Sequence, residues 1–160
     1  YLSQRCSTQV NKLKFKALVG EATIAGKRCL LMKPQTFMNL SGEAVQQATA
    51  FYKIPMENVL VLSDDVSLDV GRVRVRKKGS DGGQKGLRSI VTHMGTEEFP
   101  RIRIGVGKKP HPAYDLADWV LSKYKKEEQP LMEEAFEKAA AAARLVIGGQ
   151  IDEAMNRYSH

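Results

Sequence analysis

The sequence predicts an α/β fold, in which a mixed, twisted β-sheet carries helices packed on both of its faces. A continuous apolar run at residues 59–62 is typical of a strand that is covered on both sides. Residues 72–76 and 101–106 alternate between polar and apolar side chains, which is typical of strands with one buried face. Four apolar side chains repeat at the helical spacing i, i+3, i+4 and i+7, namely Leu87, Ile90, Val91 and Met94.

The first third of the chain predicts a pair of strands followed by a helix. Residues 15–24 and 28–32 are expected to form two strands joined by a short turn. Ser41 can cap the helix that follows, and the Ile54-Pro55 pair ends it. This helix leads into the apolar strand at 59–62, and the order strand, helix, strand predicts a right-handed crossover between parallel strands.

Polar side chains follow the two strands of this expected crossover. The loop that holds Asn39 comes after the first strand, and Asp64 and Asp65 come after the second. Ligands of open α/β sheets gather at the carboxyl ends of parallel strands, so these residues are candidates for a cleft. Asn39 could instead cap the helix, and the aspartates could cap a helix or face solvent. Neighbouring residues on a strand point to opposite faces, so only one aspartate can face the cleft.

The remainder of the chain predicts two further strands and several helices. In the strand at 72–76, Val73 and Val75 face the core and three arginines share the other face. The later elements are a helix beginning near Gly82 or Gly83, a strand at 101–106, a short helix at 115–124, a long helix from Pro130 to Gly148-Gly149, and a last short helix at 151–158.

Length and composition limit the class of protein. The 160 residues, of which 42% are hydrophobic, match one globular domain, and no repeat or linker divides them, so we expect residues 1–160 to form a single domain. No apolar stretch approaches the roughly 18 residues of a membrane span, and the N-terminus has no signal-peptide core. We therefore expect a cytoplasmic protein. Cys6 and Cys29 lie in no CxxC pair, so neither a disulfide framework nor a zinc site is expected.

The positive charge is local. Residues 72–109 carry eleven Lys or Arg against three Asp or Glu, whereas the whole chain has a net charge of +7. Clustered cations favour a polyanion, because binding releases the counterions condensed on its phosphates. The alternative is a solvated face that keeps the protein soluble.

The sequence GSDGGQKG, residues 79–86, lies next to these cations. It does not match the nucleotide-binding phosphate loop, because Gln84 stands where a glycine is needed and no Ser or Thr follows Lys85. Its backbone N–H groups could bind an anion at a helix N-terminus, or its glycines could only supply unusual backbone angles. The three histidines, at 93, 111 and 160, form no cluster that could hold a metal.

Several ordered segments resemble the bacterial-type peptidyl-tRNA hydrolase family. The segments are KPQTFMNLSGEAV, VLVLSDDVSLDVGRVRVRKKGSDGGQKGLRSI, FPRIRIGVGKKP and DEAMNRY, and together they cover the chain from Lys14 to Tyr158. The resemblance implies a metal-independent, cofactor-free hydrolase that cleaves the ester between a peptide and the 3′ ribose of tRNA, with peptidyl-tRNA as its partner, no membrane contact and a monomeric state.

The resemblance also assigns roles to residues of this chain. Asp64 matches the aspartate that orients the catalytic histidine, and Asn39 matches the asparagine that binds substrate and places the attacking water. The expected substrate-binding residues are Met38, Asn39, Gly83 and Lys85, and the expected tRNA-binding residues are Arg76, Lys77, Lys78 and Arg103. Gln84 and Lys85 stand where the family commonly has His and Asn.

The chain lacks the family's opening strand and its TRHNxG segment, which supplies the general-base histidine. We therefore expect an N-terminally truncated member that is nearly inactive by itself, with part of its sheet unpaired. The alternative is a non-catalytic RNA-binding module of the same fold, similar to the splicing-factor relatives of the family.

Overall fold

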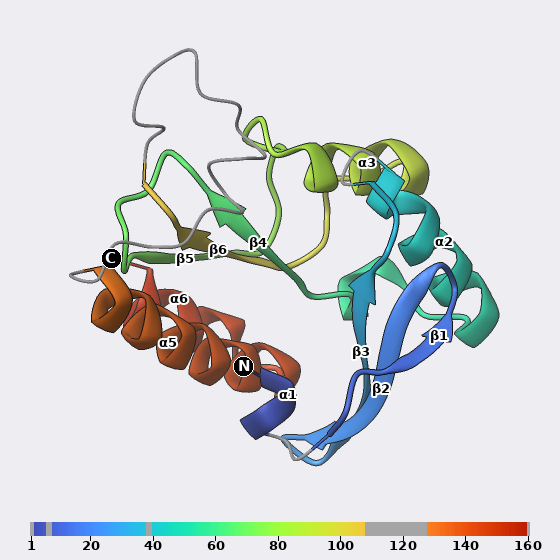
Figure 1. The fold of residues 1–160 in the computed structure, drawn as a ribbon, viewed down its shortest axis with the longest axis horizontal. Helices are drawn as coiled ribbons and strands as arrows, with labels where there is room; N and C mark the ends of the chain where they lie inside the picture. The colour runs from blue at the N-terminus through green and yellow to red at the C-terminus, as the bar shows by residue number, and fades with distance from the viewer. Residues whose placement is uncertain (1, 6–7, 38–39, 108–127, 160) are drawn as a thin grey trace.

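The computed structural model describes residues 2–5, 8–37, 40–107 and 128–159 (Figure 1). Its helices are α1 (Leu2–Arg5), α2 (Ser41–Tyr52), α3 (Lys85–Met94), α5 (Gln129–Ile147) and α6 (Ile151–Tyr158), with a 3-10 turn η2 (Met56–Asn58). Its strands are β1 (Lys12–Lys14), β2 (Ala17–Ile24), β3 (Lys27–Pro34), β4 (Val61–Asp65), β5 (Val73–Arg76) and β6 (Arg101–Gly105). None of the helices in these ranges is long and apolar enough to cross a bilayer.

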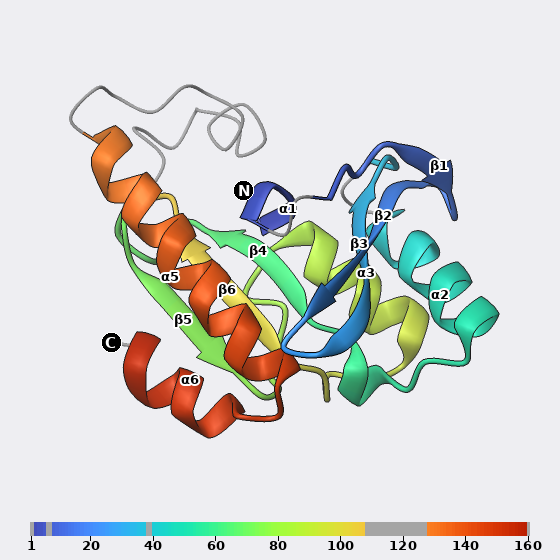
Figure 2. The same ribbon diagram turned by 90° about the horizontal axis from the view of Figure 1, so that it is seen from below.

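The described strands form two three-stranded sheets. One is antiparallel, with the order β1-β2-β3. The other has the order β4-β6-β5, in which β6 runs parallel to β4 and antiparallel to β5. The second sheet is mixed, with α5 and α6 on one face and α2 and α3 toward the other (Figures 1 and 2). The expected α/β class, with a mixed sheet and helices on both faces, is confirmed, although the strands divide between two sheets.

Strands β3 and β4, which the expected crossover joins through helix α2, do not pair with each other in the described residues. In the described residues, β3 pairs only with β2 and β4 pairs only with β6, so both are edge strands. A groove of about 1530 Å³ is lined by residues of both strands. Leu62 lines this groove and is 42% exposed, although it belongs to a run that was expected to be covered on both faces.

The core lies between the mixed sheet and the C-terminal helices. Val73, Val75 and Ile102 are buried against α5 and α6. The α5 residues that meet them are small, which brings the helix axis close to the sheet: Ala135, Ala139, Ala142 and Ala143. A second cluster joins α2 to α3 through Val45, Leu87 and Ile90. Its packing depends on Gly42, because a Cβ there would lie 2.3 Å from the Ser89 carbonyl oxygen.

The other face of the mixed sheet carries arginines. The register places Arg76 opposite Arg101 and Arg74 opposite Arg103, so like charges meet directly across β5 and β6. Such pairs are destabilising unless other groups stabilise the guanidinium charges.

Arg101 is the most constrained of these arginines. Its side chain is fully buried, and it donates hydrogen bonds to the carbonyl oxygens of Gly79 (2.7 Å), Ser80 (3.1 Å), Glu97 (2.6 Å) and Phe99 (3.2 Å). Its guanidinium carbon also lies 4.2 Å from the centroid of the Phe99 ring. Burial lowers the pKa of Arg101, and the charge of Arg103 adds to this effect. Arg101 therefore ties the segments before α3 and before β6 to the sheet.

The outer edge of β5 is closed by the end of the chain. The Ser159 hydroxyl accepts a hydrogen bond from the Val75 amide and donates one to the Val75 carbonyl at 3.1 Å. Lys77 pairs with Asp152 of α6 at 2.7 Å. The Ser159 hydroxyl thus occupies backbone groups of Val75 that would otherwise be open to pairing with another chain.

Most of the predicted elements are present, with differences at their ends. The strands of the N-terminal pair and helices α5 and α6 lie where they were expected. Ser41 is the first residue of α2 rather than its cap, and the cap position is Leu40. Helix α3 begins at Lys85, because Gly82 and Gly83 have φ angles of +60° and +83° that no helix accommodates. Strand β1 was not predicted, and the expected helix at 115–124 lies outside the described residues.

Candidate active site

The carboxylate of Asp64 and the amide of Gln84 meet at the carboxyl end of β4. Asp64 is half-buried, and its Oδ1 accepts a hydrogen bond from Gln84 Nε2 at 3.1 Å. The other end of the same amide, Gln84 Oε1, accepts from the Leu87 backbone N–H at 2.7 Å and so caps helix α3. One side chain thus links the start of α3 to the aspartate. The sequence marked position 84 as a departure from the family pattern, but no local pattern revealed this contact.

Asp65 points away from this contact, as alternation along a strand requires. It is buried, and its Oδ1 accepts hydrogen bonds from the backbone N–H of Ser67, at 2.8 Å, and from the Ser67 hydroxyl. Its Oδ2 lies 3.6 Å from Nη1 of Arg103. Asp65 therefore shapes the turn after β4, whereas Asp64 lines the groove between β3 and β4.

The glycine-rich loop is held against the sheet by Arg103. The Nη2 of Arg103 donates a hydrogen bond to the Ser80 carbonyl at 2.6 Å, and the Nη1 of Arg103 would lie 2.5 Å from a Cβ at Gly82. Any side chain at Gly82 would displace the guanidinium, and φ there is +60°. Asp81 closes the turn by accepting from the Gly83 amide at 2.8 Å through Oδ1. The loop is an ordered support for Gln84.

The four residues expected to bind tRNA differ in accessibility. Arg103 is only 15% exposed and is used inside the protein, so the structure places it as a support of the loop. Arg76 is half-buried and donates to its neighbouring Val75 carbonyl at 2.8 Å. Burial lowers the pKa of Arg76, and the nearby charges of Arg74 and Arg103 lower it further. Lys78 is exposed.

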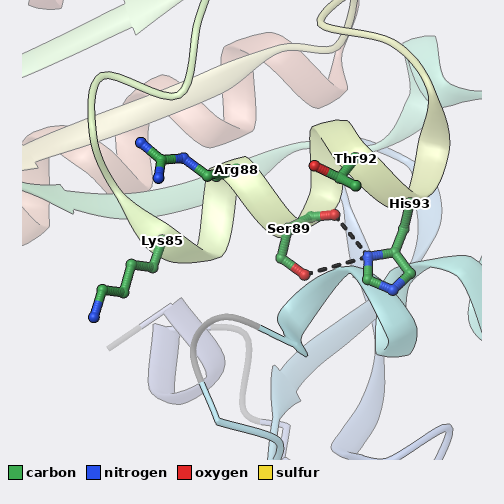
Figure 3. A pocket seen from close by; sticks show the side chains of 5 residues that line it. All are labelled: Lys85, Arg88, Ser89, Thr92 and His93. Atoms are coloured by element: carbon green, nitrogen blue, oxygen red, sulfur yellow. Dashed lines mark hydrogen bonds between the residues drawn. The ribbon is translucent and has the colours of Figure 1, made fainter.

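Lys85 lines a smaller pocket on one face of α3. The pocket has a volume of about 470 Å³, and its other lining residues are Arg88, Ser89, Thr92 and His93 (Figure 3). His93 Nδ1 lies 2.8 Å from the Ser89 carbonyl oxygen, and Lys85 extends away from it. The Ser89 hydroxyl accepts from the Gly42 amide at 2.8 Å, which connects this face to the start of α2. No hydrogen bond joins His93 to Asp64 in the described part of the chain.

Two hydroxyl groups lie in the same groove as Asp64. Thr36 Oγ1 and Ser63 Oγ are buried, and neither has a hydrogen-bond partner within residues 8–37, 40–107 and 128–159. Buried polar groups are usually hydrogen-bonded, so these atoms are candidates for contact with a ligand or water. Ser63 precedes the aspartate pair, but no sequence pattern singled it out, and nothing in the sequence pointed to Thr36.

Met38 and Asn39 lie outside the described residues, so their expected roles remain predictions. Thr36 and Ser41, on either side of them, both line the groove that contains Asp64. Gly83 is exposed beside Gln84. Asp64 and the residues on either side of Met38 and Asn39 therefore line one groove, whereas Lys85 lines the smaller pocket on α3.

Comparison with known proteins gives one consistent family. The peptidyl-tRNA hydrolase family model matches residues 1–160. A peptidyl-tRNA hydrolase of Thermoanaerobacter sp. is 49% identical over 158 residues, which cover 99% of this chain and 84% of the relative. One from Caldicellulosiruptor bescii is 49% identical over 98% of this chain and 81% of its own length. The crystal structure of the Acinetobacter baumannii enzyme matches with a TM-score of 0.89, 33% identity, and coverage of 99% of this chain and 82% of that one.

The contact between Gln84 and Asp64 can be tested by exchanging its two partners. Gln84→Glu keeps the cap acceptor but places two carboxylates together, so we expect it to destabilise the protein by about 1–2 kcal/mol. Adding Asp64→Asn to this variant places an amide at position 64 opposite the carboxylate at position 84. The free energy of unfolding should then recover. A double-mutant cycle measured by urea unfolding should give a coupling energy of about 1 kcal/mol. Additive effects of the two changes would show that the side chains do not interact.

Proposed function

The chain belongs to the peptidyl-tRNA hydrolase family, and from this premise we propose that it acts on peptidyl-tRNA, hydrolysing the ester between the peptide and the 3′ ribose and so recycling tRNA from aborted translation. The observation that carries the proposal is the family match over residues 1–160. Asp64, to which the resemblance gives the orienting role, lines the groove. The alternative of a non-catalytic RNA-binding module is not favoured, because the relatives of this chain are named as hydrolases.

Ester hydrolysis requires a base for the attacking water, a group that orients the base, and donors for the developing oxyanion. We assign the orienting role to Asp64, whose Oδ1 is held by Gln84. Asn39 has an amide that can position the water or the substrate carbonyl. Met38, Gly83 and Lys85 then line the path of the substrate. No metal or cofactor takes part in this scheme.

The general base is the part of this scheme that the described residues do not supply. Among the described residues the only histidine is His93, which is bonded to the Ser89 carbonyl within α3. The TRHNxG motif of the family is not in the 160 residues. In this proposal the chain provides the aspartate, the cleft and the tRNA surface, and the histidine of that motif would provide the base.

The tRNA backbone would lie along the arginine face of the mixed sheet and the loop that follows it. Arg76, Lys77 and Lys78 leave the sheet in succession at the end of β5. The lowered pKa of Arg76 reflects its burial and repulsion from neighbouring arginines, which an anionic phosphate would relieve. Arg103 would act mainly through the loop that it holds. We further propose that the protein is a single-domain protein of the cytoplasm, as its length and composition led us to expect, and that it is monomeric, as the resemblance implies.

Comparison of ester hydrolysis with the Thermoanaerobacter relative tests the assignment of the base. We expect the 160 residues to cleave an N-acetylaminoacyl-tRNA at least about 100-fold more slowly than the relative, because general-base catalysis contributes roughly 10²–10⁴-fold. Binding of the same tRNA should persist in both proteins. Equal rates would show that the base lies within the 160 residues. If the chain still fails to hydrolyse when the upstream segment of the relative is fused to it, the enzyme assignment is wrong.

The salt dependence of tRNA binding tests the arginine surface. Arg76→Ala should weaken binding and reduce the slope of log K against log[salt] by about one unit. When one phosphate contact is lost, binding of the protein releases about one counterion fewer from the tRNA. Lys138→Ala removes an exposed cation of α5 and is the matched control, with an unchanged slope expected. Titration of fluorescently labelled tRNA at several salt concentrations measures both. An unchanged slope in Arg76→Ala would remove that residue from the tRNA surface.

A further inference from the structure

A second surface of the protein combines exposed aromatic rings with lysines. It consists of Phe15, Phe51 and Tyr52 with Lys12, Lys14, Lys16 and Lys53, and we call it the aromatic–lysine patch. The centroids of its rings lie 5.4 Å (Phe15–Phe51), 5.8 Å (Phe15–Tyr52) and 4.9 Å (Phe51–Tyr52) apart. The patch lies where the β1–β2 turn meets the end of α2 (Figures 1 and 2). Phe51 and Tyr52 are the last two residues of α2, and neither lines the groove that contains Asp64.

Two of the three rings of this patch are exposed, whereas Phe15 is half-buried. Phe51 is 62% exposed and Tyr52 is 40% exposed. The Lys14 ammonium lies over all three rings, at 4.4 Å from the Phe51 centroid, 4.9 Å from Phe15 and 5.6 Å from Tyr52. Ring faces that attract a cation in this way can also stack against a planar base.

The backbone of the patch is strained where it presents these side chains. Phe15 and Lys16 form the turn between β1 and β2, and both have φ angles of +56°. A two-residue turn of this kind normally uses Asn-Gly, because a side chain in the left-handed region costs about 1–2 kcal/mol per residue. Lys53 also has a positive φ, of 55°, at the end of α2, where glycine is usual. Large side chains stand at three positions where their backbone conformation is costly, which points to a use for them.

The charge of the patch selects the kind of partner. Lys12, Lys14 and Lys53 form no ion pair within the described residues, whereas Lys16 bonds Glu43 at 2.9 Å. That bond holds the pKa of Glu43 below its usual value. Lysine is depleted in the centres of protein–protein interfaces, so four lysines around three rings fit a protein partner poorly. They fit a polyanion with exposed planar groups.

We propose that the aromatic–lysine patch binds single-stranded RNA, with unpaired bases stacked on Phe51 and Tyr52 and the backbone phosphates held by the surrounding lysines. Duplex RNA is a poorer ligand, because its bases are stacked on each other and are not available to the rings. None of the seven patch residues lines the groove that contains Asp64, although Thr49 and Ile54 beside them do. The inference concerns binding of RNA and does not depend on the proposed reaction.

Fluorescence anisotropy with labelled octauridylate tests this inference. Phe51→Leu keeps apolar bulk but removes the ring, and we expect its affinity for octauridylate to fall about tenfold, since stacking contributes roughly 1–3 kcal/mol per base. Tyr52→Leu should give a similar loss. Leu131→Ala, at an exposed apolar residue of α5, is the matched control and should bind like the unmodified chain. A hairpin duplex of equal charge should bind more weakly than octauridylate.

Three results would overturn the inference. Affinity unchanged in both Phe51→Leu and Tyr52→Leu would show that the rings do not contact RNA. Equal affinity for the duplex and for octauridylate would show that charge alone, and not stacking of bases, accounts for the binding. A loss of octauridylate binding in Arg76→Ala, without a loss in Phe51→Leu, would place the single strand on the arginine face. Urea unfolding of each variant confirms that the fold is intact, and tRNA hydrolysis by the fused protein should not change in Phe51→Leu, which separates this test from that of the proposed function.

Discussion

A fully buried arginine organises the functional end of this protein. Arg101 has no exposed surface, so its charge must be satisfied within the fold, and it is satisfied by carbonyl oxygens at residues 79–80 and 97–99. A buried charge without partners is strongly destabilising, so these carbonyls are held where the guanidinium can reach them. The glycine-rich loop consequently lies over the sheet. Arg103 then holds Ser80, and Gln84 is placed where it can both cap α3 and bind Asp64.

The alternating arginines of β5 and β6 have two different roles. Arg101 and Arg103 bind backbone carbonyls of the segments that lie over the arginine face, and Arg103 also approaches Asp65. Arg76 stands at the end of its strand, where burial and like charges lower its pKa. The same pattern in the sequence therefore serves both the stability of the loop and the attraction of an anion. The two roles can be told apart only when the partners of each guanidinium are known, and the alternating pattern of the sequence does not reveal these partners.

Local patterns predicted the local structure well. The spacing of apolar residues and the Pro and Gly signals gave the bounds of α5 and α6 nearly as observed, because these features act within a few residues. The pairing of strands could not be predicted in this way, since β4 pairs with β6, which lies about 40 residues further along the chain. Strand β1, with only three residues, carries too short a pattern to be recognised.

Within the site, Asp64 was identified from its place after an apolar strand and from the family resemblance. The amide that holds it was not, because Gln84 lies 20 residues away and its contact depends on the loop.

The central claim is that Arg101 places the loop that supports Gln84 and Asp64. Amide hydrogen exchange in Arg101→Lys tests it most directly, because lysine keeps the charge but cannot reach all four carbonyls. We predict that protection of the Gln84 and Leu87 amides, which are bonded to the Asp81 carbonyl and to Gln84 Oε1, falls at least about tenfold while that of α5 is unchanged. Unchanged protection at both amides would show that the loop holds its position without Arg101 and would contradict the account.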